Sequence, residues 1–238
     1  MKNKFHRISS IIIFILIFLI IFNSDSGFID TDSSAKIILW NSARDKTTTE
    51  DIVDFVNGNK ADIYLFIEFD KRKKKVAEKH NIDKLLPQYS LNQLSGNMAI
   101  LVESGNEVTR IDSLDDSYNY FNIVEVSGIK YAIVDIGSWP FYNRAKPFEM
   151  LYQLVSKHYV DIIAGDFNTP YNSVHFEKFF QNYNCGITDN KYLRETFPSC
   201  IPLVSLDHIF VSTRFKITSY APIAICKSDH YPLKINYE

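Results

Sequence analysis

Seven polar residues fall where predicted strands end, and strand ends are where α/β scaffolds tend to present catalytic groups. Taken singly, each of them could be a turn former or a cap. Taken together, they supply the carboxylate and amide oxygens that a hard cation such as Mg²⁺ prefers, and an imidazole that can act as a base near neutral pH. Phosphoester hydrolysis uses such a cation, a base and groups that stabilise additional phosphate charge. The residues are Asn41, Glu68, Asp166, Asn168, Asp207, Asp229 and His230.

Glu68 and His230 have the most informative surroundings. Glu68 follows the apolar run 63–67, where a charge is costly unless a group such as a metal ion compensates it. His230 follows Asp229 directly. Asp207 and His230 lie on or beside the last predicted strands, so they can converge at one end of a sheet. A carboxylate beside an imidazole fixes its tautomer and favours its charged form.

Short apolar runs rich in β-forming residues alternate with segments of helical period. The first two strands are predicted at residues 36–40 and 61–67. The helix between them is predicted to begin at a capping box formed by Thr47 and Glu50. A basic helical stretch follows at 70–86, and its lysine-rich run is interpreted as a solvated helix face rather than a nucleic-acid patch.

The central part is typical of an antiparallel meander, because four strand candidates follow one another closely. A helix at 144–157, with Pro147 in its first turn, leads to a strand at 160–164. Another helix is predicted around 174–183, before two last strands at 205–211 and 233–237. The meander strands are residues 97–102, 107–111, 121–126 and 130–136.

The N-terminal segment is interpreted as a targeting signal rather than as part of the fold. Lys2, Lys4 and Arg7 precede an apolar run at 11–22, and no clear cleavage site follows it. An uncleaved signal-anchor is favoured, with a cleaved signal peptide as the alternative. The positive charges then place the following residues outside the cytoplasm. The prediction is an anchor or signal peptide at 1–22, a polar tether at 23–35 and one catalytic domain at 36–238, either at the cell membrane or secreted.

The bulk composition suits one compact domain. The chain has 238 residues, 46% of them hydrophobic, and a net charge of −2, which argues against wholesale disorder and against a multi-span membrane protein. This charge lacks the basic footprint of a protein that grips long nucleic acid, although a local basic groove is compatible with it. Cys185, Cys200 and Cys226 are too irregularly spaced for a zinc site and are interpreted as buried thiols. In an exported domain, a Cys185–Cys200 disulfide becomes an alternative.

Six short motifs follow one another along the chain and cover nearly all of residues 36–238. They are Leu39-Trp40-Asn41, Phe66-Ile67-Glu68, Gly96-Asn97-Met98-Ala99-Ile100-Leu101, Gly165-Asp166-Phe167-Asn168-Thr169-Pro170, Ser205-Leu206-Asp207-His208-Ile209 and Ser228-Asp229-His230-Tyr231-Pro232-Leu233. In this order they resemble the endonuclease/exonuclease/phosphatase superfamily, which includes deoxyribonuclease-I-like enzymes, inositol-phosphate phosphatases and bacterial sphingomyelinases. The Gly-Asp-Phe-Asn and Ser-Asp-His elements are specific in combination.

The resemblance implies a four-layer α/β sandwich, in which two mainly antiparallel sheets are flanked by helices and the site lies at one end. It implies hydrolysis of phosphoester bonds by metal-assisted attack of water, with Mg²⁺ or alternatively Mn²⁺. The substrate would be nucleic acid, a phospholipid head group or a small phosphate ester. Glu68 would be the principal metal ligand, with Asn41 and Asp229 close to the metal. Asp166 and Asn168 would position the attacking water and the phosphate.

By the same resemblance, His230 is oriented by Asp207 and acts as acid/base or contacts a phosphate oxygen. The chain departs from the family at Gly137, because members usually carry a His at the end of this strand. Asp135 lies two positions earlier and hence on the same strand face, but the resemblance gives it no role. His208 points to the opposite face from Asp207 and is interpreted as structural.

The departure at Gly137 leaves a second hypothesis open. A catalytically weakened family member would act as a membrane-tethered binding module. The residues between the last motifs resemble bacterial membrane-anchored members of the superfamily, in agreement with the predicted anchor.

Overall fold

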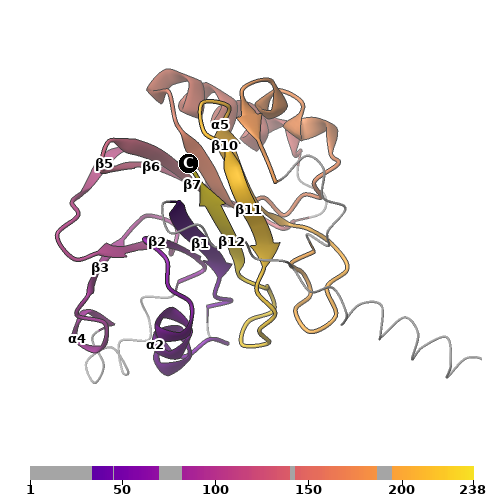
Figure 1. Ribbon diagram of the computed structural model, residues 1–238. Coiled ribbons are helices and arrows are strands. Elements are labelled where there is room, and N and C mark those ends of the chain that lie inside the picture. Colours follow the sequence, from indigo (N-terminus) through magenta and orange to yellow (C-terminus); the bar gives the residue numbers. More distant parts are fainter. Residues whose placement is uncertain (1–33, 45, 70–81, 140–142, 187–194) are drawn as a thin grey trace, which may run out of the picture.

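The computed structural model describes residues 34–44, 46–69, 82–139, 143–186 and 195–238. In this part of the chain, two six-stranded sheets pack face to face, and helices lie against their outer faces (Figure 1). The predicted four-layer α/β sandwich is therefore confirmed. Most of the predicted N-terminal signal and tether, at 1–33, lies outside the described residues, and so does the lysine-rich run at 71–75. Within the described ranges, no helix is long and apolar enough to cross a membrane.

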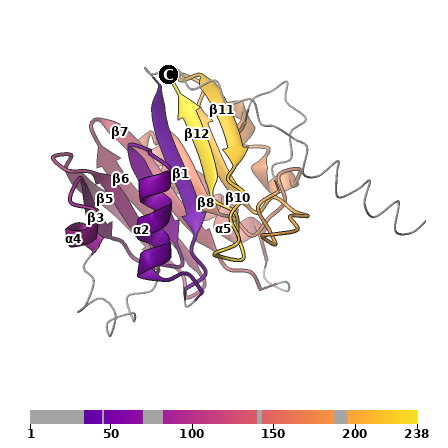
Figure 2. The same cartoon turned by 60° about the horizontal axis from the view of Figure 1, so that its bottom comes forward.

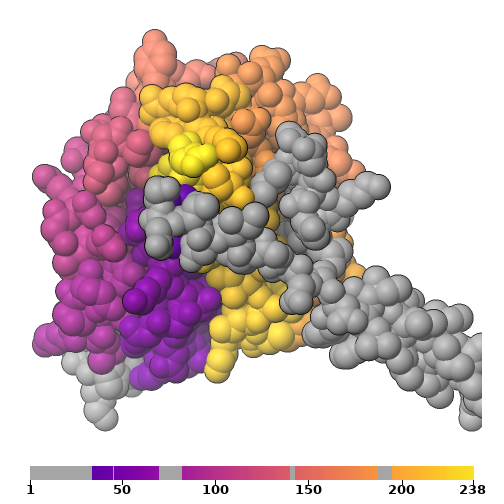
Figure 3. Space-filling view, viewed as in Figure 1, coloured from indigo at the N-terminus to yellow at the C-terminus, as the bar shows by residue number. Residues whose placement is uncertain are grey.

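The first sheet brings the two ends of the described chain together. Its strand β1 pairs in parallel with β2 and antiparallel with β12, so the indigo and yellow segments meet in the space-filling view (Figure 3). Across the sheet the order is β11 (Ile217–Pro222), β12 (Leu233–Tyr237), β1 (Ala35–Asn41), β2 (Ile63–Ile67), β4 (Ala99–Glu103) and β3 (Tyr89–Gln93).

The second sheet contains the predicted meander. Its strands β7 and β8 pair in parallel, because the helix α5 (Ala145–His158) connects them, and its other pairs are antiparallel. Across this sheet the order is β5 (Val108–Asp115), β6 (Asn119–Val126), β7 (Ile129–Ile136), β8 (Ile162–Asp166), β10 (Asp207–Ser212) and β9 (Tyr183–Asn184).

Alternation along the strands produces the core between the sheets. Residues two apart, such as Ile37 and Leu39 of β1, belong to one buried cluster that contains side chains from both sheets. The intervening residue Ile38 packs in a different cluster with the helix α2 (Thr49–Gly58), which lies over the first sheet (Figure 2). Each fully buried side chain of this kind contributes roughly 1.5–3 kcal/mol.

The helix α2 begins one residue later than the sequence predicts. Its N-cap is Thr48 rather than Thr47: the Thr48 hydroxyl accepts from the Asp51 backbone N–H at 3.1 Å, and the Asp51 carboxylate accepts from the Thr48 N–H at 3.1 Å. Thr47 is buried instead and donates from its hydroxyl to the Lys227 carbonyl at 3.2 Å. Of the helix predicted at 70–86, the described residues show α4 (Ile82–Leu85).

The helix predicted around 174–183 is wrong. Two short 3₁₀ helices, η1 (Val174–Phe176) and η2 (Phe179–Gln181), stand there, followed by β9. Phe176 is the last residue of η1, and Phe179 is the first residue of η2. Both pack on Phe210 of β10, with ring centroids 5.1 and 5.8 Å away, so this aromatic contact sets the local conformation.

The cysteine pairing also differs from the Cys185–Cys200 disulfide that the sequence left open. Cys200 and Cys226 form a disulfide that joins the loop before β10 to the loop after β11. Cys185 is a buried free thiol, and its sulfur lies 3.5 Å from the hydroxyl of Tyr220. The alternative of a Cys185–Cys200 disulfide is therefore wrong. The interpretation as buried thiols is confirmed for Cys185 and is wrong for Cys200 and Cys226.

Candidate active site

The inner faces of both sheets change from apolar to polar at the same end of the sandwich. On the second sheet, Asp166 ends β8 and Asp207 begins β10, and the two are in register because these strands are antiparallel. On the first sheet, Asn41 takes the last inward position of β1. Its side-chain amide donates to a carboxylate oxygen of Asp166 at 2.9 Å, which links the two sheets.

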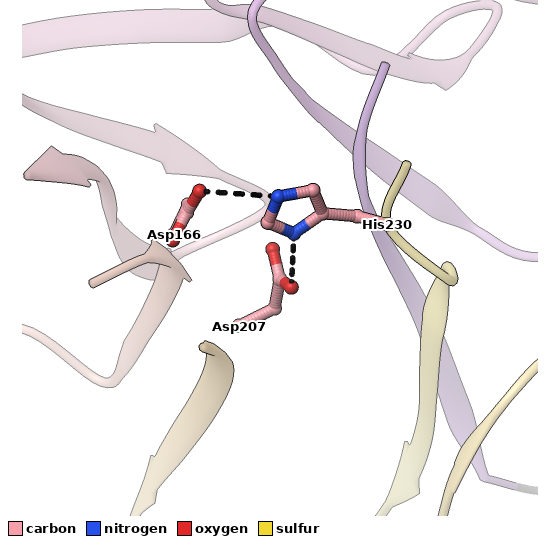
Figure 4. A group of neighbouring side chains, drawn as sticks. All are labelled: Asp166, Asp207 and His230. Carbon is pink, nitrogen blue, oxygen red and sulfur yellow. Dashed lines mark hydrogen bonds and ion pairs between the residues drawn. The ribbon is translucent and has the colours of Figure 1, made fainter. Parts of the chain in front are cut away.

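His230 lies between the two aspartates (Figure 4). Its Nδ1 is 2.7 Å from Asp207 Oδ2, and its Nε2 is 3.8 Å from Asp166 Oδ2. The imidazole is only 6% exposed, and the two aspartates are 1% and 2% exposed. The predicted Asp207–His230 pair is therefore present, and its Nε2 faces Asp166.

Two residues that the sequence analysis does not single out hold this arrangement. Thr196 donates from its hydroxyl to Asp207 Oδ2 at 2.5 Å. The Ser228 hydroxyl donates to the carbonyl of Asn41 at 2.6 Å and accepts from the His230 N–H at 3.2 Å. Ser228 belongs to the terminal Ser-Asp-His motif, so its residue type was visible in the sequence. Thr196 belongs to the stretch that resembles bacterial membrane-anchored members, and that resemblance gives it no role.

Burial and charge act in opposite directions on the imidazole. Burial alone would lower the pKa of His230, but the adjacent Asp207 carboxylate and the more distant Asp166 raise that pKa to about 9. Burial and the neighbouring Asp207 raise the pKa of Asp166 to about 7, although the positive imidazole opposes this. At neutral pH, the imidazolium form of His230 is therefore favoured, and Asp166 is harder to ionise than an ordinary aspartate.

Glu68 and Asp229, the two carboxylates predicted as metal ligands, are each paired with a cation from the loop after β1. Arg44 Nε lies 3.2 Å from Glu68 Oε2, and Lys46 Nζ lies 2.5 Å from Asp229 Oδ2. Burial would raise the pKa of Asp229, but the hydrogen bond from Lys46 holds it below its ordinary value. Glu68 has a φ of 55°, an uncommon backbone conformation for this residue type and one that concentrates at functional sites.

Asn168 connects the turn after β8 to the neighbouring strand. Its backbone N–H donates to Asp166 Oδ1, and its side-chain amide donates to the carbonyl of Ile136, both at 2.8 Å. Its φ of 46° suits asparagine, which tolerates the left-handed region. His208 points to the other side of the sheet, where its Nε2 lies 2.8 Å from the carbonyl of Thr169, in agreement with a structural role.

The strand end at Gly137 has little room for a side chain. A Cβ at this position would lie 2.8 Å from the carbonyl oxygen of Tyr118, so a larger residue would require the backbone to move. Asp135, two residues earlier, is only 7% exposed. Burial, followed by the charges of Asp166 and Glu68, raises the pKa of Asp135 well above its ordinary value.

The donor set of this site fits a divalent cation. Asp166, Asp207 and, in its neutral form, His230 each offer a ligand atom, and these atoms lie within 4.8 Å of one another. Asp207 Oδ1 is buried, and no described residue makes a hydrogen bond with it. Because the surrounding donors are mostly carboxylate and amide oxygens, the site suits a hard ion such as Mg²⁺ better than a soft one. The seven predicted residues therefore lie at one end of the sandwich. Of these, Glu68 and Asp229 are the two that form ion pairs with Arg44 and Lys46.

Comparison with known proteins agrees with this arrangement. A family model described as the endonuclease/exonuclease/phosphatase family matches residues 38–230. No curated protein matches the chain by sequence. An endonuclease/exonuclease/phosphatase family protein from Bacteroides thetaiotaomicron is similar in structure, with a TM-score of 0.64 and 15% identity over 86% of this chain and 97% of that chain.

Two further solved structures have the same fold. The mannosyl-6-phosphatase of Bacteroides thetaiotaomicron gives a TM-score of 0.63 at 14% identity, covering 86% of this chain and 100% of that chain. TDP2 from D. rerio, complexed with a single-strand DNA product, gives 0.62 at 16% identity, covering 87% of this chain and 100% of that chain.

Proposed function

Because the chain belongs to the endonuclease/exonuclease/phosphatase family, we propose that it hydrolyses phosphoester bonds with the help of a bound divalent cation, Mg²⁺ or alternatively Mn²⁺. One observation carries this proposal. Asn41, Asp166, Asp207 and His230 come from distant parts of the sequence and meet through hydrogen bonds and ion pairs at one buried end of the sandwich. A set of caps with no shared role would not need to converge in this way.

Glu68, Asn41 and Asp229 would hold the cation. The ion, when bound, would polarise the phosphoryl group and lower the pKa of a water molecule. In this structure, Arg44 and Lys46 form ion pairs with Glu68 and Asp229. Binding of the cation to these carboxylates would release the two side chains to contact phosphate oxygens, which guanidinium and ammonium groups bind well.

His230 is suited to act as the general acid. Its raised pKa keeps it protonated at neutral pH, and its Nδ1 is held by Asp207, so the proton available to substrate is the one on Nε2. Asp166 is suited to accept a proton from the attacking water, because its pKa lies near neutrality. Asn168, hydrogen-bonded to Asp166, would orient that water and the phosphate.

We further propose that the catalytic domain works outside the cytoplasm, tethered by residues 1–22. The Cys200–Cys226 disulfide supports this location, because disulfides persist mainly in oxidising compartments. The apolar N-terminal run and its flanking positive charges support a membrane tether.

A substrate panel tests the proposed activity. Proteins of this fold include one named as a sugar-phosphate phosphatase and one solved with a DNA product. We therefore expect turnover of at least one compound among DNA, RNA, sphingomyelin, inositol phosphates and sugar phosphates, with Mg²⁺ and not with chelator. Binding of a phosphoester without any turnover would favour the weakened binding module instead.

A further inference from the structure

Three aspartates stand side by side across the second sheet. Asp135 of β7 is in register with Asp166 of β8, and Asp166 is in register with Asp207 of β10. All three continue the inward-facing positions of their strands, since Ile133, Ala164 and Ile209 belong to the core between the sheets. Neighbouring side chains in such a row lie about 4.5–5.5 Å apart at Cβ.

A row of like charges in a buried place is unfavourable unless each charge is compensated. Asp207 is compensated by His230 and Thr196. Asp166 accepts hydrogen bonds from the side-chain amide of Asn41 and the backbone of Asn168.

Asp135 has no comparable partner. It is 7% exposed, and within the described ranges no hydrogen bond or ion pair to its carboxylate is found. After burial, the charged groups that influence its pKa are Asp166, Glu68, Arg44 and Asp207, in decreasing order, and Arg44 is the one cation among them. On its other side, the row continues with Tyr120 of β6, which brings no charge. The inner wall of the site therefore carries a buried carboxyl group that pairs with no described residue of the protein.

We propose that Asp135 is a further ligand of the divalent cation, on the wall opposite Glu68. This inference rests on the proposed function and extends it, because none of the family motifs in this chain includes Asp135. The cation would be held between the carboxylates of Glu68 from the first sheet and Asp135 from the second. It would compensate the unpaired end of the aspartate row and so tie the two sheets together at the open end of the sandwich.

Calorimetric titration of the full-length protein with MgCl₂ tests the proposal. Asp135→Asn removes the charge and keeps the shape, so we expect Mg²⁺ affinity to fall at least about tenfold, as loss of a supporting ligand typically does. In chelator, we expect the thermal midpoint of Asp135→Asn to rise above that of the unchanged protein, because an uncompensated buried carboxylate has been removed.

Asp161, which directly precedes β8, provides a matched control. It is 4% exposed but fully engaged, because it accepts from the Lys130 backbone at 2.9 Å and forms an ion pair with Arg214. Asp161→Asn should therefore lower the thermal midpoint in chelator and leave the Mg²⁺ affinity unchanged. A purely structural role for Asp135 would make its variant behave in the same way as this control, and that result would overturn the proposal.

A second measurement does not depend on the folding of any variant. Anomalous diffraction from crystals of the unchanged protein with Mn²⁺ should place the ion within about 2.0–2.6 Å of an Asp135 oxygen, the range of metal–oxygen bonds for hard cations. An ion bound to Glu68 but distant from Asp135 would overturn this inference and leave the proposed function intact. Absence of any binding or turnover in the unchanged protein would instead overturn the proposed function and this inference with it.

Discussion

Replacement of Asp207 by asparagine removes the charge beside His230 while keeping the size of the side chain. In the structure, Asp207 Oδ2 lies 2.7 Å from Nδ1 of the imidazole, and both groups are almost fully buried. The change therefore acts on the contact with the imidazole and on the hydrogen bond from Thr196 to the same oxygen. It should lower the pKa of His230 and leave the orientation of the ring less restricted.

The magnitude follows from the two pKa values. Raising the pKa of His230 from 6.5 to about 9 corresponds to a preference for the imidazolium of about 3 kcal/mol. At pH 7.5 the unchanged imidazole is then about 97% protonated, by the same pKa of about 9. Without the Asp207 carboxylate, burial still lowers the pKa, while Asp166 and Asp229 still raise it. If these effects cancel, the pKa returns to its ordinary 6.5, and about 10% of the imidazole stays protonated at pH 7.5. We then expect about a tenfold loss of kcat from protonation alone.

Loss of orientation adds to this, and complete removal of the imidazole in His230→Ala should cost about 10²–10⁴-fold in kcat. The assay is kcat at pH 7.5 and at pH 5.5 for the unchanged protein, both single variants and the double variant, with the thermal midpoint of each. At pH 5.5 most of the imidazole is protonated even without Asp207. The ratio of the kcat of the unchanged protein to that of Asp207→Asn should therefore be about tenfold smaller at pH 5.5 than at pH 7.5.

Two results would refute this reasoning. An equal deficit at both pH values would mean that Asp207 does not act through the charge of His230. A double variant that loses the product of the two single losses would mean that the residues do not act as a unit. If both residues merely cap strand ends, the thermal midpoints would fall while kcat per folded molecule stayed nearly constant.

Four further predictions follow from the site and the N-terminus. Glu68→Gln should abolish turnover and weaken Mg²⁺ binding while the domain stays folded; unchanged Mg²⁺ affinity by calorimetry would contradict its role as a ligand. Arg44→Ala should tighten Mg²⁺ binding by up to about fivefold, because Arg44 pairs with Glu68 when no metal is bound; weaker binding would argue against competition. In chelator, the thermal midpoint should fall as pH rises from about 7 through about 9, because the raised pKa of His230 stabilises the fold only while the imidazole is protonated; His230→Ala should flatten this slope, and a flat profile for the unchanged protein would refute it. Fractionation with protease treatment of intact cells should find the chain in the membrane with residues 36–238 accessible, whereas a soluble chain beginning near Gly27 would indicate a cleaved signal peptide.

The sequence predicts the main features of the fold because the central strands are short, nearly continuous apolar runs. β1 and β8 are buried on both faces, and the polar residue that ends each run marks the site. The end of a strand and the start of its antiparallel neighbour lie at the same edge of a sheet, which explains why Asp166 and Asp207 meet.

Other features depend on contacts that no local pattern encodes. Arg44 pairs with Glu68 from a loop position where its own φ is 46°. No sequence pattern predicts this left-handed conformation. The Cys200–Cys226 pairing depends on how two long loops approach each other. Asp135 sits at an inward position by simple alternation, but its lack of a partner becomes evident only from the register of three strands.

The most direct test of metal-dependent hydrolysis is the initial rate of phosphoester cleavage as Mg²⁺ is added back to the chelator-treated protein, using a chromogenic diester and a monoester. We predict a negligible cleavage rate in chelator, a saturable rise of this rate with Mg²⁺ and no comparable rise for Glu68→Gln. A rate that is unaffected by chelator, or a Glu68→Gln variant that is fully activated by Mg²⁺, would contradict it.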